Sequence, residues 1–193
     1  MLVKGPHVYL RTVRAADLDQ LYLYTCDVEA RGPYFPIFFG SASDFKQEFE
    51  KDGFLKPDDG TLLICDHTDR MLGVLYFFKA TPYFDGCEIG YRLFDIQNSG
   101  HGLMTEALML CTYLLFVWKK INRLELKIFP ENIGSKRVAQ KCGYQYEGLL
   151  RGCDFHRGEN RDMESYSILR SEAPRSLEEA LARLAALRTA RTP

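Results

Sequence analysis

The stretch Glu88-Ile89-Gly90-Tyr91-Arg92-Leu93-Phe94-Asp95-Ile96-Gln97-Asn98-Ser99-Gly100-His101-Gly102-Leu103-Met104-Thr105-Glu106-Ala107 decides the fold of this 193-residue chain. Its pattern predicts a strand, a polar loop containing Gln-x-x-Gly-x-Gly, and a long apolar helix. The first backbone N–H groups of such a helix have no partner within it, and the helix dipole adds partial positive charge. Gly100 and Gly102 lack a Cβ, so the backbone can approach a phosphate closely. The stretch therefore predicts an anion-binding loop.

Glycine spacing alone leaves other interpretations of this loop open, including a plain turn between a strand and a helix. A P-loop is disfavoured because no Lys-Ser or Lys-Thr follows the second glycine. A Rossmann fold is disfavoured because a third glycine is missing and because the loop lies late in the chain.

Two motifs in sequence order support the phosphate interpretation. The stretch from Glu88 resembles motif A of the GCN5-related N-acetyltransferases, and its Glu-Ile-Gly-Tyr-x-Leu is similar to the ribosomal-protein N-acetyltransferase branch. Residues 132–144, Asn-Ile-Gly-Ser-Lys-Arg-Val-Ala-Gln-Lys-Cys-Gly-Tyr, resemble motif B, with Gly143 well placed to end a helix. The spacing of Gly158, Asp162 and Tyr166 is also similar to that branch. The resemblance covers roughly residues 7–170.

This resemblance implies an α/β (α+β) fold with a central mixed, mostly antiparallel twisted sheet of about seven strands. The sheet is splayed in the middle and flanked by helices. Strands are predicted over 7–13, 61–66, 71–78, 88–96, 122–128, 144–154 and 161–169, and helices from 17, 43, 103 and 132. Asp17 is the predicted cap of the first helix, and Ser43 or Ser41 is the predicted cap of the second.

The end of the chain predicts an appended element. We expect residues 1–172 to form the N-acyltransferase domain and residues 173–193 an amphipathic C-terminal helix. Ser176 and Glu179 form a capping box at its start. Leu177, Leu181, Leu184 and Leu187 share one face, which packs on the domain or on a partner subunit, so a homodimer is left open.

Composition restricts the class of protein. Hydrophobic residues make up 46% and charged residues 26%, and a net charge of −1 argues against a nucleic-acid partner held by a basic field. No apolar run is long enough for a membrane span, and no secretory signal is visible at the start. The six cysteines are scattered without a Cys-x-x-Cys pair, which favours reduced thiols in a cytoplasmic protein and argues against a metal site.

The resemblance also implies roles for individual residues toward acetyl-CoA, the expected co-substrate. Phe94 and Ile96 lie on the splayed strand, whose backbone pairs with the pantetheine arm. The expected pyrophosphate contacts are Gln97, Gly100, His101, Gly102, Leu103 and Met104. Exposure to solvent is the alternative for the His101 side chain.

Acyl transfer to an amine requires a held donor, a neutral amine, a route for its proton and stabilisation of the leaving thiolate. Asn132 caps a helix and by resemblance also bonds the pantetheine amide, while Ser135 stabilises the thiolate by a hydrogen bond. Glu88 is the expected base, with a surface carboxylate or a water chain as alternatives. Tyr144, Tyr166, His67 and His156 are lesser candidates.

The segment Arg31–Gly40 contains two prolines and several aromatic residues, so it cannot form a regular helix. It either covers the edge of the core, which is the favoured interpretation, or lines a pocket. Its aromatic character favours a small or aromatic acceptor over a highly charged one.

These observations predict an acetyl-CoA-dependent N-acetyltransferase that acts by direct attack of a primary amine on the thioester in a ternary complex. The acceptor is a protein N-terminus or a small-molecule amine. The alternative is a non-catalytic acyl-CoA-binding sensor or scaffold with the same fold.

Overall fold

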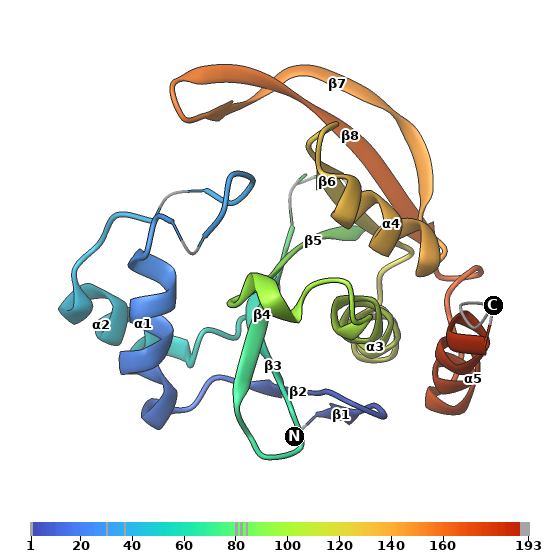
Figure 1. Ribbon diagram of the computed structural model, residues 1–193, viewed down its shortest axis with the longest axis horizontal. Helices are drawn as coiled ribbons and strands as arrows, with labels where there is room; N and C mark the ends of the chain where they lie inside the picture. Colours follow the sequence, from blue (N-terminus) through green and yellow to red (C-terminus); the bar gives the residue numbers. More distant parts are fainter. Residues whose placement is uncertain are drawn as a thin grey trace.

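The computed structural model describes residues 2–29, 31–36, 38–79, 81, 83 and 85–189. One sheet of eight strands runs through the molecule in the order β1-β2-β3-β4-β5-β6-β8-β7 (Figure 1). The strands are β1 (Val3–Lys4), β2 (Tyr9–Thr12), β3 (Asp59–Cys65), β4 (Met71–Phe78), β5 (Gly86–Leu93), β6 (Arg123–Ile128), β7 (Gln145–His156) and β8 (Glu159–Leu169). The helices are α1 (Leu18–Cys26), α2 (Ala42–Asp52), α3 (Leu103–Trp118), α4 (Ile133–Lys141) and α5 (Leu177–Thr189). The mixed, mostly antiparallel sheet is confirmed, and the two-residue β1 is the strand beyond the seven expected.

The sheet separates two hydrophobic cores because alternate residues of a strand face opposite sides. On β3, Leu62 and Ile64 pack in the core formed with α3, whereas Leu63 and Cys65 pack in the core that contains residues of α1. Most of α3 is buried, including Leu108 and Leu110. This burial explains why α3 is apolar on nearly every side.

The sheet opens between β5 and β6, which are its only parallel neighbours among the described strands. These two strands pair at three positions only, the last of which joins Glu88 to Glu125. Beyond that point β5 continues against β4 as far as Leu93, and β6 continues against β8 as far as Ile128. The predicted splay is therefore present, as a V-shaped opening that starts at Glu88.

The predicted cap at Asp17 is wrong, although Ser41 does cap α2 by accepting from the Asp44 N–H at 3.1 Å. The Asp17 carboxylate accepts from the Arg11 guanidinium at 2.6 and 2.8 Å and from the Arg14 N–H at 2.7 Å. Arg11 is only 2% exposed, and a buried guanidinium requires a counter-ion. Asp17 therefore ends a short 3₁₀ turn before α1 and does not cap the helix.

The C-terminal helix α5 packs on the domain. Leu184 is buried in the core that contains α3, and the other three predicted leucines are partly buried against the same core. The capping box forms in part: Ser176 Oγ accepts from the Glu179 N–H, but the Glu179 carboxylate accepts from the Arg175 N–H. Residues 190–193 lie outside the described residues.

Two further observations concern the described part of the chain. No helix there is long and apolar enough to cross a membrane. All six cysteines are free thiols, four of them buried.

Candidate active site

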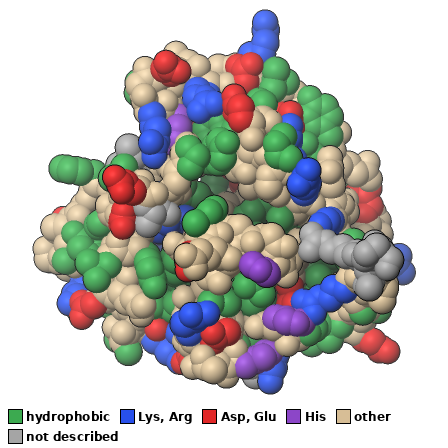
Figure 2. Space-filling model, in the orientation of Figure 1, with side chains coloured by type: hydrophobic (Ala, Val, Ile, Leu, Met, Phe, Trp, Pro, Cys, Tyr) green, Lys and Arg blue, Asp and Glu red, His purple; other side chains and the backbone are tan. Residues whose placement is uncertain are grey.

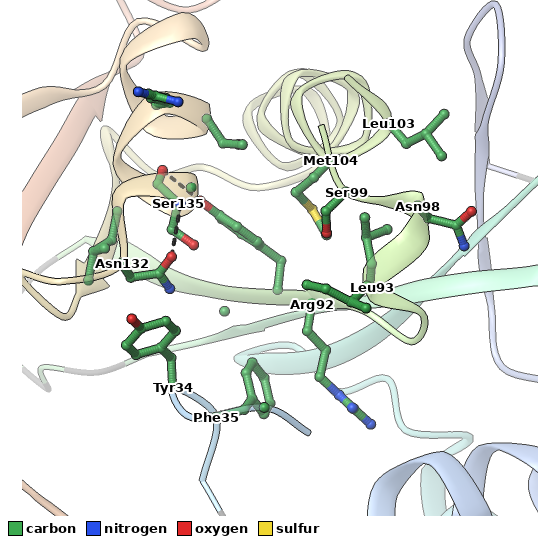
Figure 3. A pocket seen from close by; sticks show the side chains of 18 of the residues that line it. Tyr34, Phe35, Arg92, Leu93, Asn98, Ser99, Leu103, Met104, Asn132 and Ser135 are labelled. Atoms are coloured by element: carbon green, nitrogen blue, oxygen red, sulfur yellow. Dashed lines mark hydrogen bonds between the residues drawn. The ribbon is translucent and has the colours of Figure 1, made fainter. Parts of the chain in front are cut away.

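A cavity of about 940 Å³ occupies the opening between β5 and β6. It is bounded by the loop before α3, by the first turns of α3 and α4, and by residues 31–35 (Figure 3). Figure 2 shows the molecule hollowed near the middle of this face, with hydrophobic side chains around the hollow. The cavity thus lies where the backbone groups of two diverging strands face each other without pairing.

The glycine loop has the backbone geometry that its sequence predicts. Gly100 and Gly102 both have φ of +83°, a left-handed conformation that L side chains rarely adopt. Asp95 accepts from the Gln97 N–H at 2.8 Å and turns the chain into a 3₁₀ turn over Ile96–Asn98. Gly102 then precedes the first residue of α3, so the unpaired N–H groups of that helix begin at the cavity.

Most residues predicted to contact the donor line this cavity, namely Phe94, Ile96, Gly100, Gly102, Leu103, Met104, Asn132 and Ser135. Gln97 and His101 are exposed and are not among the lining residues. The Phe94 ring stacks on the Tyr24 ring with 4.1 Å between the ring centroids, in the core that contains residues of α1. Only the backbone of Phe94 is therefore available to a ligand. That any of these residues binds coenzyme A stays a prediction.

The start of α4 is held against β5. Asn132 Oδ1 accepts from the Ser135 N–H at 3.1 Å, which confirms the predicted cap. The Tyr91 hydroxyl donates to the Ser135 carbonyl at 3.3 Å (Figure 3). Burial raises the pKa of Tyr91 well above its ordinary value, so this phenol stays protonated. The first turn of α4, with Ser135, is thereby fixed beside the cavity.

Glu88 lies at the closed end of the opening and is not itself a lining residue. Burial raises its pKa to about 7, with further upward contributions from Glu125 and Asp154 and an opposing one from Lys127. Lys127 lines the cavity and forms an ion pair with Glu125 at 2.7 Å. A carboxyl that titrates near neutral pH at such a position is suited to proton transfer.

The lesser candidates do not line the cavity. The Tyr144 hydroxyl bonds Thr112 in the core, and the Tyr166 hydroxyl donates to Glu164. His67 lies on an exposed turn beside the Pro6 carbonyl. His156 is buried, and its Nε2 donates to the Pro33 carbonyl at 2.8 Å.

The favoured interpretation of the Arg31–Gly40 segment is wrong for its first half, because residues 31–35 line the cavity. In its second half, Phe38 packs on Phe45 and Phe39 is fully exposed, while Ile37 lies outside the described residues. The two prolines were a signal of irregular backbone, but no local pattern places such a segment against β5.

Sequence reasoning also missed the charged residues of the cavity. Arg31, Arg92, Lys127, Arg137 and Lys141 line it, against the acidic residues Glu29 and Asp95. This excess of positive charge suits a phosphorylated ligand. Among the described residues, no group of His, Cys, Asp or Glu side chains is placed to hold a metal ion.

Comparisons with known proteins agree with this architecture. Residues 7–145 match the family described as acetyltransferase (GNAT) domain. The chain is similar to a probable N-acetyltransferase, YjcK, of Bacillus subtilis (strain 168), with 37% identity over 84 residues, covering 43% of this chain and 46% of that protein. It is also similar to the ribosomal-protein-serine acetyltransferase of Escherichia coli (strain K12), with 28% identity over 99 residues, covering 51% and 55%. The chain thus spans about half the length of these relatives.

Among solved structures, the fold is similar to Mycobacterium smegmatis RimJ in complex with CoA-disulfide. The TM-score is 0.76 at 24% identity, and the match covers 93% of this chain and 88% of that one. At this identity the likeness concerns the fold. The matches confirm the predicted fold and the resemblance to the ribosomal-protein branch.

Proposed function

Since the chain belongs to the acetyltransferase (GNAT) domain family, we propose that it is an acetyl-CoA-dependent N-acetyltransferase. It acetylates a primary amine, a protein N-terminus or a small molecule, by direct attack on the thioester in a ternary complex. The observation that carries this proposal is the junction of two features in one cavity: a glycine loop at the start of α3 and the unpaired strand edges of β5 and β6.

The cavity suits a donor with a pyrophosphate at one end and an amide-bearing arm at the other. Backbone N–H groups from Gly100 to Met104 hold the pyrophosphate, helped by the basic side chains of Arg137 and Lys141. The free edge of β5 pairs with the arm as an added strand would, and Asn132 bonds an amide of the arm. The donor supplies the activated acetyl group when it is bound.

The chain's own residues then serve the proton and the leaving sulfur. Ionised Glu88 accepts the proton of the amine, directly or through water, since it shares a face of β5 with the lining residues Gly90 and Arg92. The Ser135 hydroxyl stabilises the departing thiolate by a hydrogen bond, on a helix turn fixed by Asn132 and Tyr91.

Thiol release from acetyl-CoA across a panel of amines and short peptides with free N-termini tests the proposal. Ser135→Ala and Glu88→Gln are compared with Ser171→Ala and Glu50→Gln, which change the same residue types at exposed positions that do not line the cavity. We expect the site variants to lose about 10²-fold in turnover while calorimetry shows unchanged donor binding. The two controls keep full activity.

Other outcomes separate the alternatives. Donor binding without thiol release for any acceptor would indicate the acyl-CoA sensor or scaffold. Absence of coenzyme A binding would overturn the assignment of the glycine loop itself.

A further inference from the structure

Two arginines on the side of the cavity opposite the donor elements are not used by the proposed chemistry. On β5, Ile89, Tyr91 and Leu93 pack toward α3, so the alternate residues Gly90 and Arg92 face the other side of the sheet. Figure 3 shows the Arg92 side chain extending away from α3, on the side of the sheet where Phe35 lies. Arg31 reaches the same place from the loop after α1.

Both guanidinium groups lie over one aromatic ring. The Arg31 and Arg92 Cζ atoms lie 5.2 and 5.7 Å from the centroid of the Phe35 ring. Arg31 is 9% exposed and Arg92 is 7% exposed, yet both line the cavity. Two positive charges are therefore held together over one aromatic ring at one end of the cavity.

The hydrogen bonds of these arginines fix their positions, and one buried donor atom, Arg92 Nε, has no hydrogen-bond partner among the described residues. Arg31 donates to the carbonyls of Thr25 and Pro36, and Arg92 donates to the carbonyl of Tyr24. A guanidinium carries five N–H donors, so one that is held by main-chain carbonyls can still donate to a carboxylate. The carbonyls belong partly to the last turn of α1, where cations are favourable, so a purely structural role is the competing explanation.

The local charge balance favours an anion. Burial lowers the pKa of Arg92, and the neighbouring charge of Arg31 contributes in the same direction. Burial also lowers the pKa of Arg31. Asp27 opposes this lowering of the Arg92 pKa. Glu29 also lines the cavity, but its side chain is exposed. A carboxylate placed between two desolvated guanidiniums would form strong charge-assisted hydrogen bonds.

We propose that the acceptor end of the cavity selects an amine that also carries a carboxylate, which Arg31 and Arg92 bind. This inference rests on the proposed function and names its acceptor class. The carboxylate belongs either to a small amino acid or to an acidic side chain near a peptide N-terminus. A polyamine would bring ammonium groups against two buried guanidiniums and is disfavoured by like-charge repulsion.

The test uses matched acceptors at saturating acetyl-CoA with thiol release as the readout. One series holds unbranched amines that end in a carboxylate, a carboxamide or a second amine. A second series holds short peptides with Asp or Asn after the free N-terminal residue, which separates the two sources of carboxylate. We expect kcat/KM for the carboxylate of at least one series to exceed that of its amide by about tenfold or more, and the diamine to be poorest.

The variants assign this preference to the arginines. Arg92→Gln and Arg31→Gln should each bring the carboxylate-to-amide ratio close to one, while Arg92→Lys keeps part of it because the charge remains. Arg175→Gln, which changes an exposed arginine that does not line the cavity, should leave the ratio unchanged.

Two results would overturn the inference. One is a ratio near one, or a preference for the diamine, in the unchanged protein. The other is a carboxylate preference that survives in both Gln variants while turnover of every acceptor and the melting temperature fall together, which would leave the arginines as caps of α1. A protein that turns over no acceptor at all would contradict the proposed function instead.

Discussion

The buried environment of Glu88 predicts a specific pH dependence of the activity. Because its pKa lies at about 7, we expect kcat/KM to rise with pH through about 7 as the carboxylate forms. Glu88→Gln should remove this limb of the profile and keep only the rise due to deprotonation of the acceptor amine. A profile of the variant that still rises near pH 7 would exclude Glu88 as the base.

The raised pKa of Glu88 also predicts that the free energy of unfolding depends on pH, whether or not the enzyme turns over. The pKa of Glu88 is higher in the folded protein than the ordinary 4.5, so the native state binds the proton more tightly between about pH 4.5 and 7. The free energy of unfolding therefore falls as pH rises through this window, by at most about 3 kcal/mol. Urea unfolding at several pH values should show this fall in the unchanged protein and its reduction in Glu88→Gln.

At the scale of elements, the loop before α3 depends on a left-handed glycine. Gly100 has φ of +83°, and a Cβ there would meet no atom within 4 Å, so Gly100→Ala introduces backbone strain without a clash. We expect a stability loss of about 1 kcal/mol and, in addition, weaker binding of coenzyme A. Gly53→Ala, at φ of +67° at the end of α2, is the matched control and should lose stability only. Equal coenzyme A affinity in both variants would contradict the prediction.

The hairpin of β7 and β8 supports the acceptor side of the cavity. Its turn reaches over the 31–36 segment, where Arg157 donates to the Gly32 carbonyl at 3.0 Å beside the bond from His156 to Pro33 (Figure 1). Arg157 has φ of +53°, so Arg157→Gly removes the guanidinium and relieves the backbone. We expect KM for the acceptor to rise about fivefold, with coenzyme A affinity unchanged by calorimetry. Arg157→Asn, which tolerates the same backbone, should behave alike.

At the scale of the whole molecule, a buried carboxylate joins the two ends of the chain to α3. Glu106 is fully buried and accepts from the N–H groups of His7 and Val8 and from Arg188 Nη2 at 2.7 Å. Glu106→Gln should lower the free energy of unfolding by about 1–3 kcal/mol because the amide places an N–H₂ donor against donors that the buried carboxylate accepts. Urea unfolding of Glu106→Gln, Arg188→Ala and the double variant gives the coupling, which we expect to exceed about 0.5 kcal/mol. Additive effects would show that α5 docks without this ion pair.

For the whole molecule, a homodimer stays a prediction. The leucines of α5 lend it no support because they pack on the same chain. Sedimentation of the full chain would measure it directly.

The sequence by itself determined the order of the main elements, the glycine loop and the cap at Asn132, and it restricted the cap of α2 to Ser43 or Ser41. These features depend on backbone conformation and on hydrogen bonds within a few residues, so the local residue types are enough to predict them. The placement of Glu88, Ser135 and the glycine loop around one opening followed from the family resemblance, because the point where β5 leaves β6 has no local signature.

Only the tertiary structure decided what surrounds that opening. Strand β5 brings Arg92 beside Arg31 and Phe35, residues about sixty positions earlier in the chain. The pKa of Glu88 likewise depends on burial and on charges from β6 and β7. Each of these is a long-range contact, whose energy depends on which side chains share a buried space and not on the residues beside them in sequence.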